Sequence, residues 1–374
     1  MPKKGESRYS PYMEDMQKWR EEGLSIRKIM KKLEEKGFDN PSFGGVRTNL
    51  ELSNKFEDTL DEAGFTPPEN WSHGWLKTKK ASIFIKNENK EEEFNVLKDN
   101  FLAYVKQHAP KYPKIDRKAV TDAHLLVVDP CDIHIGKLAE AFETRDDYNS
   151  EIAVRRVKEG VQGILSKSAP YNVDKILLIL GNDILHTDTP KRTTTAGTPQ
   201  DTDGMWYTNF LKAKQVMIEV IEMLMTRADV HCIFNPSNHD FMSGFFLVDS
   251  IKSWFSRCEH VTFDADMKHR KYFQYGENII GTTHGDGAKE SDLPLLMAHE
   301  AGHGWMVKHK YYYCHHLHRK SSKDYMGVNV EVMRSASGTD SWHASQGYQH
   351  APKAIEGFLH HPLHGQVARF VHIF

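Results

Sequence analysis

Four short apolar runs recur between residues 124 and 287, and they constrain the fold more than any other feature of the chain. They occupy residues 124–129, 175–183, 230–240 and 278–287. Residues 151–169 and 209–228, which lie between them, carry apolar side chains at helical spacing. Because strand-length runs that alternate with amphipathic helices are typical of sheets covered by helices, the pattern predicts an α/β fold.

Residues 1–60 differ from this pattern and predict a small all-α module. Met16 and Trp19 share one face of a first helix, and Ile29 and Leu33 share one face of a second. A third helix is expected after a turn that contains Pro and Ser. The first 50 residues hold eleven Lys and Arg against eight Asp and Glu. This arrangement resembles a helix-turn-helix DNA reader, and a three-helix packing module is the alternative.

Residues 61–119 are expected to form a connecting segment. A short strand is predicted at residues 77–87 and a helix at residues 90–110, ended by proline. The α/β domain is then expected to take up residues 120–374.

The composition excludes several classes of protein. A hydrophobic fraction of 39% and a charged fraction of 27% are those of a globular protein rather than a disordered one. No apolar run has the length of a membrane span and the first residues do not resemble a signal peptide, so we expect a cytoplasmic protein without membrane contact. The four cysteines form no C-x-x-C pair, which argues against a zinc knuckle or a disulfide framework. The net charge of -2 excludes a uniformly basic protein but not a local basic patch.

Each apolar run is followed by residue types that bind metals, and the 22 histidines crowd into the second half of the chain. In chain order the groups are Asp132 and His134, Asp183 and His186, Asn238 with His239 and Asp240, then His284, and finally His316 and His318. Residues i and i+2 of an extended segment point the same way, so one carboxylate and one imidazole can bind the same ion. Strand ends of an α/β sheet meet at one edge, which indicates a shared metal site.

In this order the groups resemble the calcineurin-like metallophosphoesterase superfamily, whose pattern is D-x-H, G-D-x-x-[DH], G-N-H-[DE], H and G-H-x-H. The resemblance covers roughly residues 120–320 and implies a sandwich of two central β-sheets flanked by helices, preceded by the small helix-turn-helix-like module. Within the superfamily, the form G-x-D-x-x-H looks most like the SbcD-type DNA repair exonucleases. Residues 193–201 are similar to phage-encoded members that carry an N-terminal helical module. Three residues depart from the pattern: Cys131 before the first Asp, Ser237 in place of Gly, and His315 in place of Gly.

The resemblance also implies a role for each residue. Metal ligands would be Asp132, His134 and His318 for a first ion, Asn238, His284 and His316 for a second, and Asp183 as a bridge between them. His239 would contact the scissile phosphate and protonate the leaving oxygen, with Asp240 as its orienting partner. His186 would be a second phosphate contact, and a structural histidine that caps the strand end is the alternative.

Two divalent ions and two ligand carboxylates leave a net charge of +2, which attracts a phosphodiester. A hydroxide that bridges the ions could then act as the nucleophile. The mixed nitrogen and oxygen ligands favour manganese, with iron or zinc as alternatives, over magnesium or calcium.

Two further features could select a substrate. Residues 187–205 form a polar segment rich in Thr, in which Lys191 and Arg192 could meet a nucleic-acid backbone; a solvated insertion is the alternative. Trp342, His343 and the His-rich residues 350–364 could stack on bases, but the sequence favours ordinary core or surface positions for them.

These observations favour a metal-dependent DNA nuclease that acts without membrane contact and could form a homo-oligomer. Its partner would be DNA, and its location would be the cytoplasm, of a bacterial host if the protein is phage-encoded. The alternatives are a small-nucleotide phosphodiesterase or phosphatase, and a non-enzymatic DNA-binding regulator. The regulator is disfavoured because a site that no longer catalyses a reaction should have lost some of its ligand residues, and none is missing from the pattern.

Overall fold

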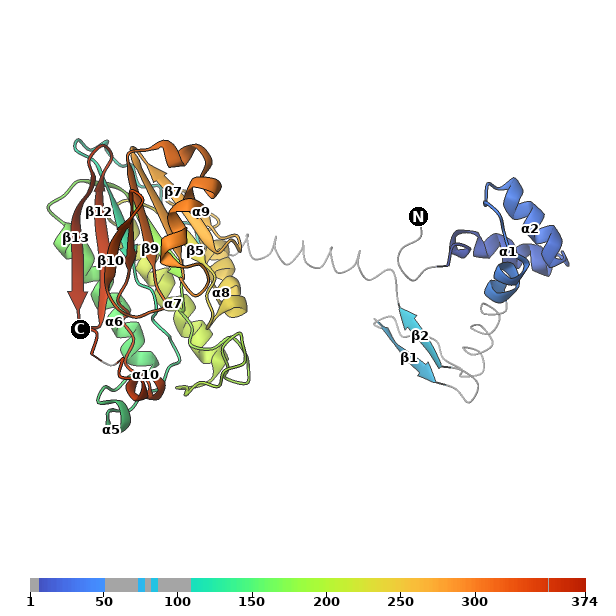
Figure 1. Ribbon diagram of the computed structural model, residues 1–374, viewed down its shortest axis with the longest axis horizontal. Coiled ribbons are helices and arrows are strands. Elements are labelled where there is room, and N and C mark those ends of the chain that lie inside the picture. Colours follow the sequence, from blue (N-terminus) through green and yellow to red (C-terminus); the bar gives the residue numbers. More distant parts are fainter. Residues whose placement is uncertain (1–6, 51–72, 78–81, 87–108, 349) are drawn as a thin grey trace. The chain divides into compact units, whose positions relative to one another are not determined.

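The computed structural model describes residues 7–50, 73–77, 82–86, 109–348 and 350–374. The chain divides into two compact units, Met1–Phe101 and Leu102–Phe374. Figure 1 shows the helices and strands of each unit, which are described separately below.

The first unit contains a small helical group with its own apolar core. Its elements are η1 (Ser10–Tyr12), α1 (Met13–Glu21), α2 (Ile26–Glu35) and a helical stretch at residues 43–50. Met16, Trp19, Ile29 and Leu33 are buried together, so the helical faces expected from the sequence are confirmed. Val46 joins this core from the third helical stretch.

A two-stranded hairpin follows in the first unit. Strands β1 (His73–Lys77) and β2 (Ser82–Lys86) pair antiparallel. The strand expected at residues 77–87 therefore exists as β2, whereas β1 was not expected. The helix expected at residues 90–110 lies outside the described residues except for its last two positions.

The second unit is built on a six-stranded sheet with the order β13-β12-β3-β4-β5-β6. Its strands are β3 (His124–Asp129), β4 (Val173–Gly181), β5 (Asp229–Asn235), β6 (Val261–Asp264), β12 (Ala354–His361) and β13 (Gly365–Ile373). β3 to β6 are parallel, and β12 and β13 extend the sheet antiparallel. The parallel strands bring the chain segments that follow them to one edge of the sheet.

A second, five-stranded sheet has the order β10-β11-β9-β8-β7. Its strands are β7 (Arg270–Tyr275), β8 (Asn278–Thr283), β9 (His309–Cys314), β10 (Ser321–Tyr325) and β11 (Val328–Val332). β8, β9 and β11 run parallel, whereas β7 and β10 pair antiparallel at the two edges.

The two sheets pack face to face because side chains alternate along each strand. Leu125 and Val127 of β3 lie in one buried cluster with Ile280 of β8 and Tyr313 of β9, which places this cluster between the sheets. Leu126, on the opposite face of β3, belongs to a second cluster under the helices. The predicted architecture of two central sheets flanked by helices is confirmed.

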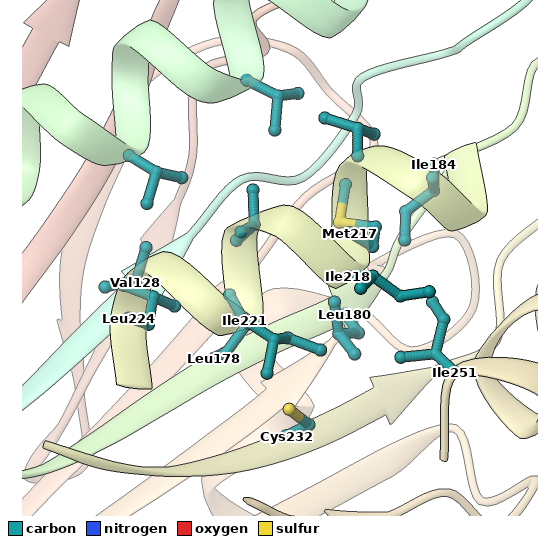
Figure 2. Packing of buried hydrophobic residues seen from close by; sticks show 14 of the residues in the cluster. Val128, Leu178, Leu180, Ile184, Met217, Ile218, Ile221, Leu224, Cys232 and Ile251 are labelled. Atoms are coloured by element: carbon teal, nitrogen blue, oxygen red, sulfur yellow. The ribbon is translucent and has the colours of Figure 1, made fainter. Parts of the chain in front are cut away.

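Helices α6 (Ser150–Ser168), α7 (Trp206–Met225) and α8 (Phe241–Trp254) cover the six-stranded sheet. Figure 2 shows Met217, Ile221 and Leu224 of α7 packed over Leu178 of β4 and Cys232 of β5. The other face of the five-stranded sheet packs against α9 (Leu293–Glu300). The remaining short helices are α5 (Ala141–Thr144), η2 (Glu290–Asp292), η3 (Gly302–Met306) and α10 (Ser341–Ser345).

The apolar runs of the sequence correspond to β3, β4, β5 and β8, and the two predicted helices correspond to α6 and α7. The four cysteines are buried and unpaired, as expected. Among the described residues, no helix is long and apolar enough to cross a membrane.

Candidate metal centre

The polar residues that follow the strands do meet at one end of the two sheets. Asp132 and His134 follow β3, Asp183 follows β4, and His316 and His318 follow β9. All five have positive φ angles, between 50° and 68°. Non-glycine residues rarely adopt this left-handed conformation outside turns and functional sites. The backbone therefore turns sharply at each strand end and directs a polar side chain inward.

The first group of ligand types contains Asp132, His134 and His318, whose ligand atoms lie within 4.8 Å of one another. The Nε2 atoms of His134 and His318 are 3.2 Å apart, and His318 Nε2 is 3.6 Å from Asp132 Oδ1. Asp132 is fully buried, and its other oxygen, Oδ2, accepts the backbone N–H of His316 at 3.1 Å. This hydrogen bond joins the loops that follow β3 and β9.

The second group contains Asp183, His284 and His316. His284 Nε2 lies 3.2 Å from Asp183 Oδ2 and 2.8 Å from the side-chain oxygen of Asn238. One imidazole nitrogen thus faces both a carboxylate oxygen and an amide oxygen, which is the arrangement of ligand atoms around a cation.

Asp183 connects the two groups through a single oxygen. Oδ2 lies 3.2 Å from His284 Nε2 and 3.9 Å from His134 Nε2, and these histidines belong to different groups. The other oxygen, Oδ1, accepts the backbone N–H of His239 at 3.0 Å, which fixes the carboxylate. The structure therefore brings together all seven residues that the sequence indicated as ligands, with Asp183 between the groups.

His186 and His239 form a third group with His134. The Nδ1 atoms of His186 and His134 are 3.2 Å apart, and the rings of His186 and His239 stack with centroids 5.3 Å apart. His186 is buried, whereas His239 is partly exposed. His186 thus packs against a candidate ligand, and His239 is the more accessible of the two rings.

Asp240 does not orient His239, contrary to the expectation from the sequence. His239 Nδ1–H donates instead to the backbone carbonyl of His186 at 2.9 Å. The Asp240 oxygens accept from the backbone N–H of Leu185 at 2.9 Å and from the hydroxyl of Ser237 at 2.6 Å. A backbone carbonyl therefore holds the ring, and Asp240 fixes the loop that follows β4.

Ser237, one of the three departures from the family pattern, has a structural role that sequence reasoning missed. Its hydroxyl donates to Asp240 and accepts the backbone N–H of Asp183 at 2.8 Å. The hydroxyl does both with one atom, which the glycine of the family pattern cannot do, and the spacing of the sequence contains no signal for this contact.

The other two departures, Cys131 and His315, meet at one buried carboxylate behind the centre. His315 Nε2 lies 2.9 and 3.0 Å from the two oxygens of Asp129, and its Nδ1–H donates to the Thr283 carbonyl at 3.1 Å. The Cys131 thiol donates to Asp129 Oδ1 at 2.6 Å. This Asp129–His315 pair joins the end of β3 to the end of β9, on which four of the candidate ligands depend.

Burial and neighbouring charges set the ionisation of the carboxylates. Burial alone would raise the pKa of Asp183, but the charge of His284 outweighs it and lowers that pKa. Burial would also raise the pKa of Asp132, but the nearby His318 outweighs it, so this pKa is lowered too. For Asp240, burial and the nearby Asp183 carboxylate raise the pKa to about 7. The two candidate ligand carboxylates are thus ionised at neutral pH, as metal binding requires.

The pKa values of the histidines shift in different directions because their surroundings differ. Burial lowers the pKa of His134 well below its usual range, and Lys137 adds to this effect. Burial likewise lowers the pKa of His318, to about 4, against the opposing charge of Asp132. Burial opposes a charge on His284 too, but Asp183 outweighs it and raises that pKa to about 9. In the absence of metal, a proton on His284 therefore neutralises part of the carboxylate charge.

These residues fit a pair of divalent ions. The oxygen Oδ1 of Asp132 is buried and accepts no hydrogen bond from any described residue, although it faces His318. A buried carboxylate oxygen without a partner is costly unless a cation satisfies it. The donor set of imidazole nitrogens with carboxylate and amide oxygens is also the one that manganese, iron and zinc accept.

A cavity of about 1020 Å³ opens above the centre. Its base includes His134, Asp183 and His239, one wall comes from residues 194–201, and another comes from residues 340–348 with His350 and Ala351. A volume near the upper end of the range for ligand pockets leaves room for a substrate larger than inorganic phosphate.

No family model matches the sequence, and no curated protein matches it. Among solved structures, the chain is similar to an archaeal phosphodiesterase, with 11% identity and a TM-score of 0.33 over 67% of this chain and 99% of that chain. It is also similar to Vps29 from Entamoeba histolytica, with 13% identity and a TM-score of 0.29 over 67% and 99% of the two chains. A predicted phosphoesterase from Streptococcus pneumoniae has 12% identity and a TM-score of 0.27 over 68% and 99%. These values are low, so the interpretation of the centre depends on its own side chains.

Proposed function

We propose that this chain is a phosphodiester hydrolase that uses two divalent metal ions. The observation that carries the proposal is the position of Asp183 Oδ2 between two groups of ligand types, 3.2 Å from His284 and 3.9 Å from His134. A carboxylate oxygen shared in this way suits two ions close together. When bound, such ions would supply positive charge for a phosphate and activate a water molecule.

His239 would supply the acid of the reaction. Its Nδ1–H is committed to the His186 carbonyl, so Nε2 is the nitrogen available to a substrate. His239 also lines the cavity. A protonated Nε2 could donate to the leaving oxygen, and the His186 carbonyl would keep the ring in the required orientation. The packing of His186 against His134 favours its role as a support for this ring over a direct phosphate contact.

We further propose that the substrate is DNA and that manganese is the metal, with iron or zinc as alternatives. The helical module supports DNA as the partner: its first 50 residues hold eleven Lys and Arg against eight Asp and Glu, and Lys and Arg in a helix-turn-helix-like arrangement suit a phosphate backbone. The resemblance of the G-x-D-x-x-H motif to SbcD-type nucleases supports a nuclease, and the similarity of residues 193–201 to phage-encoded members supports a phage origin. A homo-oligomer and a cytoplasmic location stay predictions.

A panel of substrates tests the proposal. Single-stranded DNA, duplex DNA, RNA and a nitrophenyl phosphodiester are incubated with the protein and manganese, and hydrolysis is measured. We expect DNA and the small diester to be cleaved. Asp183→Asn should abolish both reactions with little loss of folded protein, since one carboxylate serves both groups of ligands.

Three results would contradict the proposal at different levels. Cleavage of mononucleotides or small diesters without cleavage of DNA would favour the small-nucleotide phosphodiesterase. Duplex binding without any hydrolysis would favour the non-enzymatic regulator. Full activity of Asp183→Asn with unchanged metal content would show that the candidate metal centre does not carry out the hydrolysis.

A further inference from the structure

Two large aromatic side chains lie exposed at the side of the cavity above the centre. Trp342 of α10 is 60% exposed and Tyr348 is 63% exposed, and their ring centroids are 6.0 Å apart. Both rings line the cavity whose base contains the candidate ligands. Adjacent exposed aromatic rings beside a polar centre are typical of binding surfaces, because ring faces left in water gain by contact with a flat ligand.

The segment that carries these rings is anchored to the centre. Asp340 caps α10: its Oδ1 accepts the backbone N–H of His343 at 2.8 Å and the imidazole Nδ1–H of the same residue at 2.6 Å. Its Oδ2 lies 2.9 Å from Lys137 Nζ, and the Lys137 side chain is 1% exposed. Lys137 follows His134 by three residues on the loop after β3. The buried ion pair therefore ties the ring-bearing segment to a loop that supplies ligands.

Stacked rings connect the centre to Trp342. His343 stacks on the candidate ligand His318, with centroids 5.1 Å apart and planes only 8° from parallel. Trp342 meets His343 edge to face at 5.0 Å. One ring, that of His343, therefore separates the indole from a candidate ligand, so the indole lies beside the centre rather than in it.

Polar and charged residues also line the cavity, beside apolar ones such as Ala196, Pro199 and Leu317. Thr194, Thr198 and Gln200 line the side formed by the Thr-rich segment. Arg319, next to His318, lines the cavity, is exposed, and is not paired with a carboxylate in the described parts of the chain. Hydroxyl groups and a guanidinium on either side of a metal centre suit sugar and phosphate groups that flank the reacting one.

We propose that Trp342, with Tyr348 beside it, is a stacking platform for the nucleobase next to the scissile phosphate. The inference rests on the proposed function and specifies its substrate class: a nucleic acid whose base is unstacked, which means a single strand or a frayed end rather than an intact duplex. Stacking on an indole is tolerant of sequence because every base has a π-face. The platform would therefore position any nucleotide without selecting its base.

A matched pair of substrates tests the platform. The p-nitrophenyl ester of thymidine 5′-phosphate and methyl p-nitrophenyl phosphate share the leaving group, and only the first carries a base. Trp342→Ala should lower the ratio of their kcat/KM values by at least about fivefold, the scale of one lost base stack. Trp342→Phe, which keeps a ring, should retain most of the ratio. Trp206→Ala is the matched control, because Trp206 is an exposed tryptophan at the start of α7 that does not line the cavity.

A binding measurement gives a second readout that does not need turnover. The fluorescence of a single-stranded pentanucleotide that contains 2-aminopurine should be quenched when it binds the Asp183→Asn variant, which should not cleave it, and adding Trp342→Ala to this variant should remove most of the quenching. Free 2-aminopurine nucleotide serves as the second probe: quenching of the strand alone identifies a strand as the ligand, and equal quenching of both identifies the nucleotide.

The outcomes separate this inference from the proposed function. An unchanged kcat/KM ratio and unchanged quenching in Trp342→Ala would overturn the platform while leaving the hydrolase intact. Quenching that depends on Trp342 in a protein whose wild-type form hydrolyses neither substrate would support the platform and overturn the hydrolase. Quenching by intact duplex equal to that by the single strand would overturn the preference for an unstacked base.

Discussion

The buried pair of Asp129 and His315 allows a quantitative test of how the candidate ligands are held. Both side chains are fully buried, and both imidazole nitrogens of His315 face oxygen acceptors. Burial opposes a charge on His315, but Asp129 outweighs it and raises the pKa of His315. Each ring nitrogen of His315 has an oxygen acceptor, which suits a protonated ring beside the Asp129 carboxylate, and this buried ion pair joins the two sheets.

The proposed change is His315→Leu, which leaves the Asp129 carboxylate buried without a cation. Removing one partner of a buried ion pair costs about 3–5 kcal/mol. Each kcal/mol corresponds to about 2–4 °C in the Tm of a large domain. We therefore expect the Tm to fall by at least about 6 °C, measured by circular dichroism on the metal-free protein. The double variant Asp129→Leu/His315→Leu should recover much of this loss, because no uncompensated charge remains.

His360→Leu is the matched control. His360 is equally buried, but it bonds the neutral Tyr313 hydroxyl at 2.9 Å, and burial lowers its pKa to about 3. Its loss removes a hydrogen bond between neutral groups, worth about 0.5–1.5 kcal/mol. We expect a smaller fall in Tm than for His315→Leu.

The pH dependence of the two variants should differ in sign. The pKa of His315 is raised, so the pair stabilises the fold fully below pH ~6.5 and loses this contribution as the pH rises through the raised value. The fall in Tm caused by His315→Leu should therefore become smaller above pH ~6.5. The pKa of His360 is lowered, so its contribution is complete above pH ~6.5 and declines as the pH falls towards 3. The ion pair would be refuted if His315→Leu and His360→Leu lowered the Tm equally at every pH, and if the effects of Asp129→Leu and His315→Leu simply added in their double variant.

Three further changes test other parts of the molecule. His239→Gln should keep both metals but lower turnover by ~10² or more, the scale of a lost general acid; a fall in metal content would instead make His239 a ligand. Deletion of residues 1–60 should weaken duplex binding and its salt dependence while a small chromogenic diester is still cleaved; unchanged duplex binding would remove the helix-turn-helix interpretation. Gly181→Ala should reduce metal binding measured by calorimetry, because Gly181 has a φ of +81° and its added Cβ would lie 2.1 Å from the Asn235 carbonyl; wild-type affinity would show that the loop after β4 adapts.

The parts of the fold that the sequence predicted share a physical property. β3, β4, β5 and β8 are buried on both faces, so each is a continuous apolar run that a sequence displays directly. β10 has exposed or partly exposed residues throughout, and β13 has only one buried residue. Strands of this kind lack a distinct pattern in the sequence, which is why these two were missed. β11 and β12 were missed although most of their residues are buried.

In the candidate site, the ligand residues could be predicted from the sequence, whereas the residues that support them could not. Its ligand types follow strands in chain order, and that order is visible in the sequence before any contact is known. The supports are not visible, because they join distant segments: Asp129 and His315 are 186 positions apart, and Asp183 and Ser237 are 54 apart. Cys131, Ser237 and His315 therefore looked like isolated departures from a pattern, whereas the structure gives each of them a partner.

The left-handed backbone at the ligands explains why those supports are needed. A non-glycine residue in this conformation costs about 1–3 kcal/mol and persists only when surrounding contacts fix it. The backbone N–H of Asp132 donates to the Asn182 carbonyl at 2.8 Å, and that of His134 donates to the Asp183 carbonyl at 2.9 Å. The loops after β3 and β4 thus continue to hydrogen-bond beyond the sheet. Since these bonds involve no side chain of the centre, the ligand positions are set by the fold itself, and metal ions would bind an arrangement that already exists.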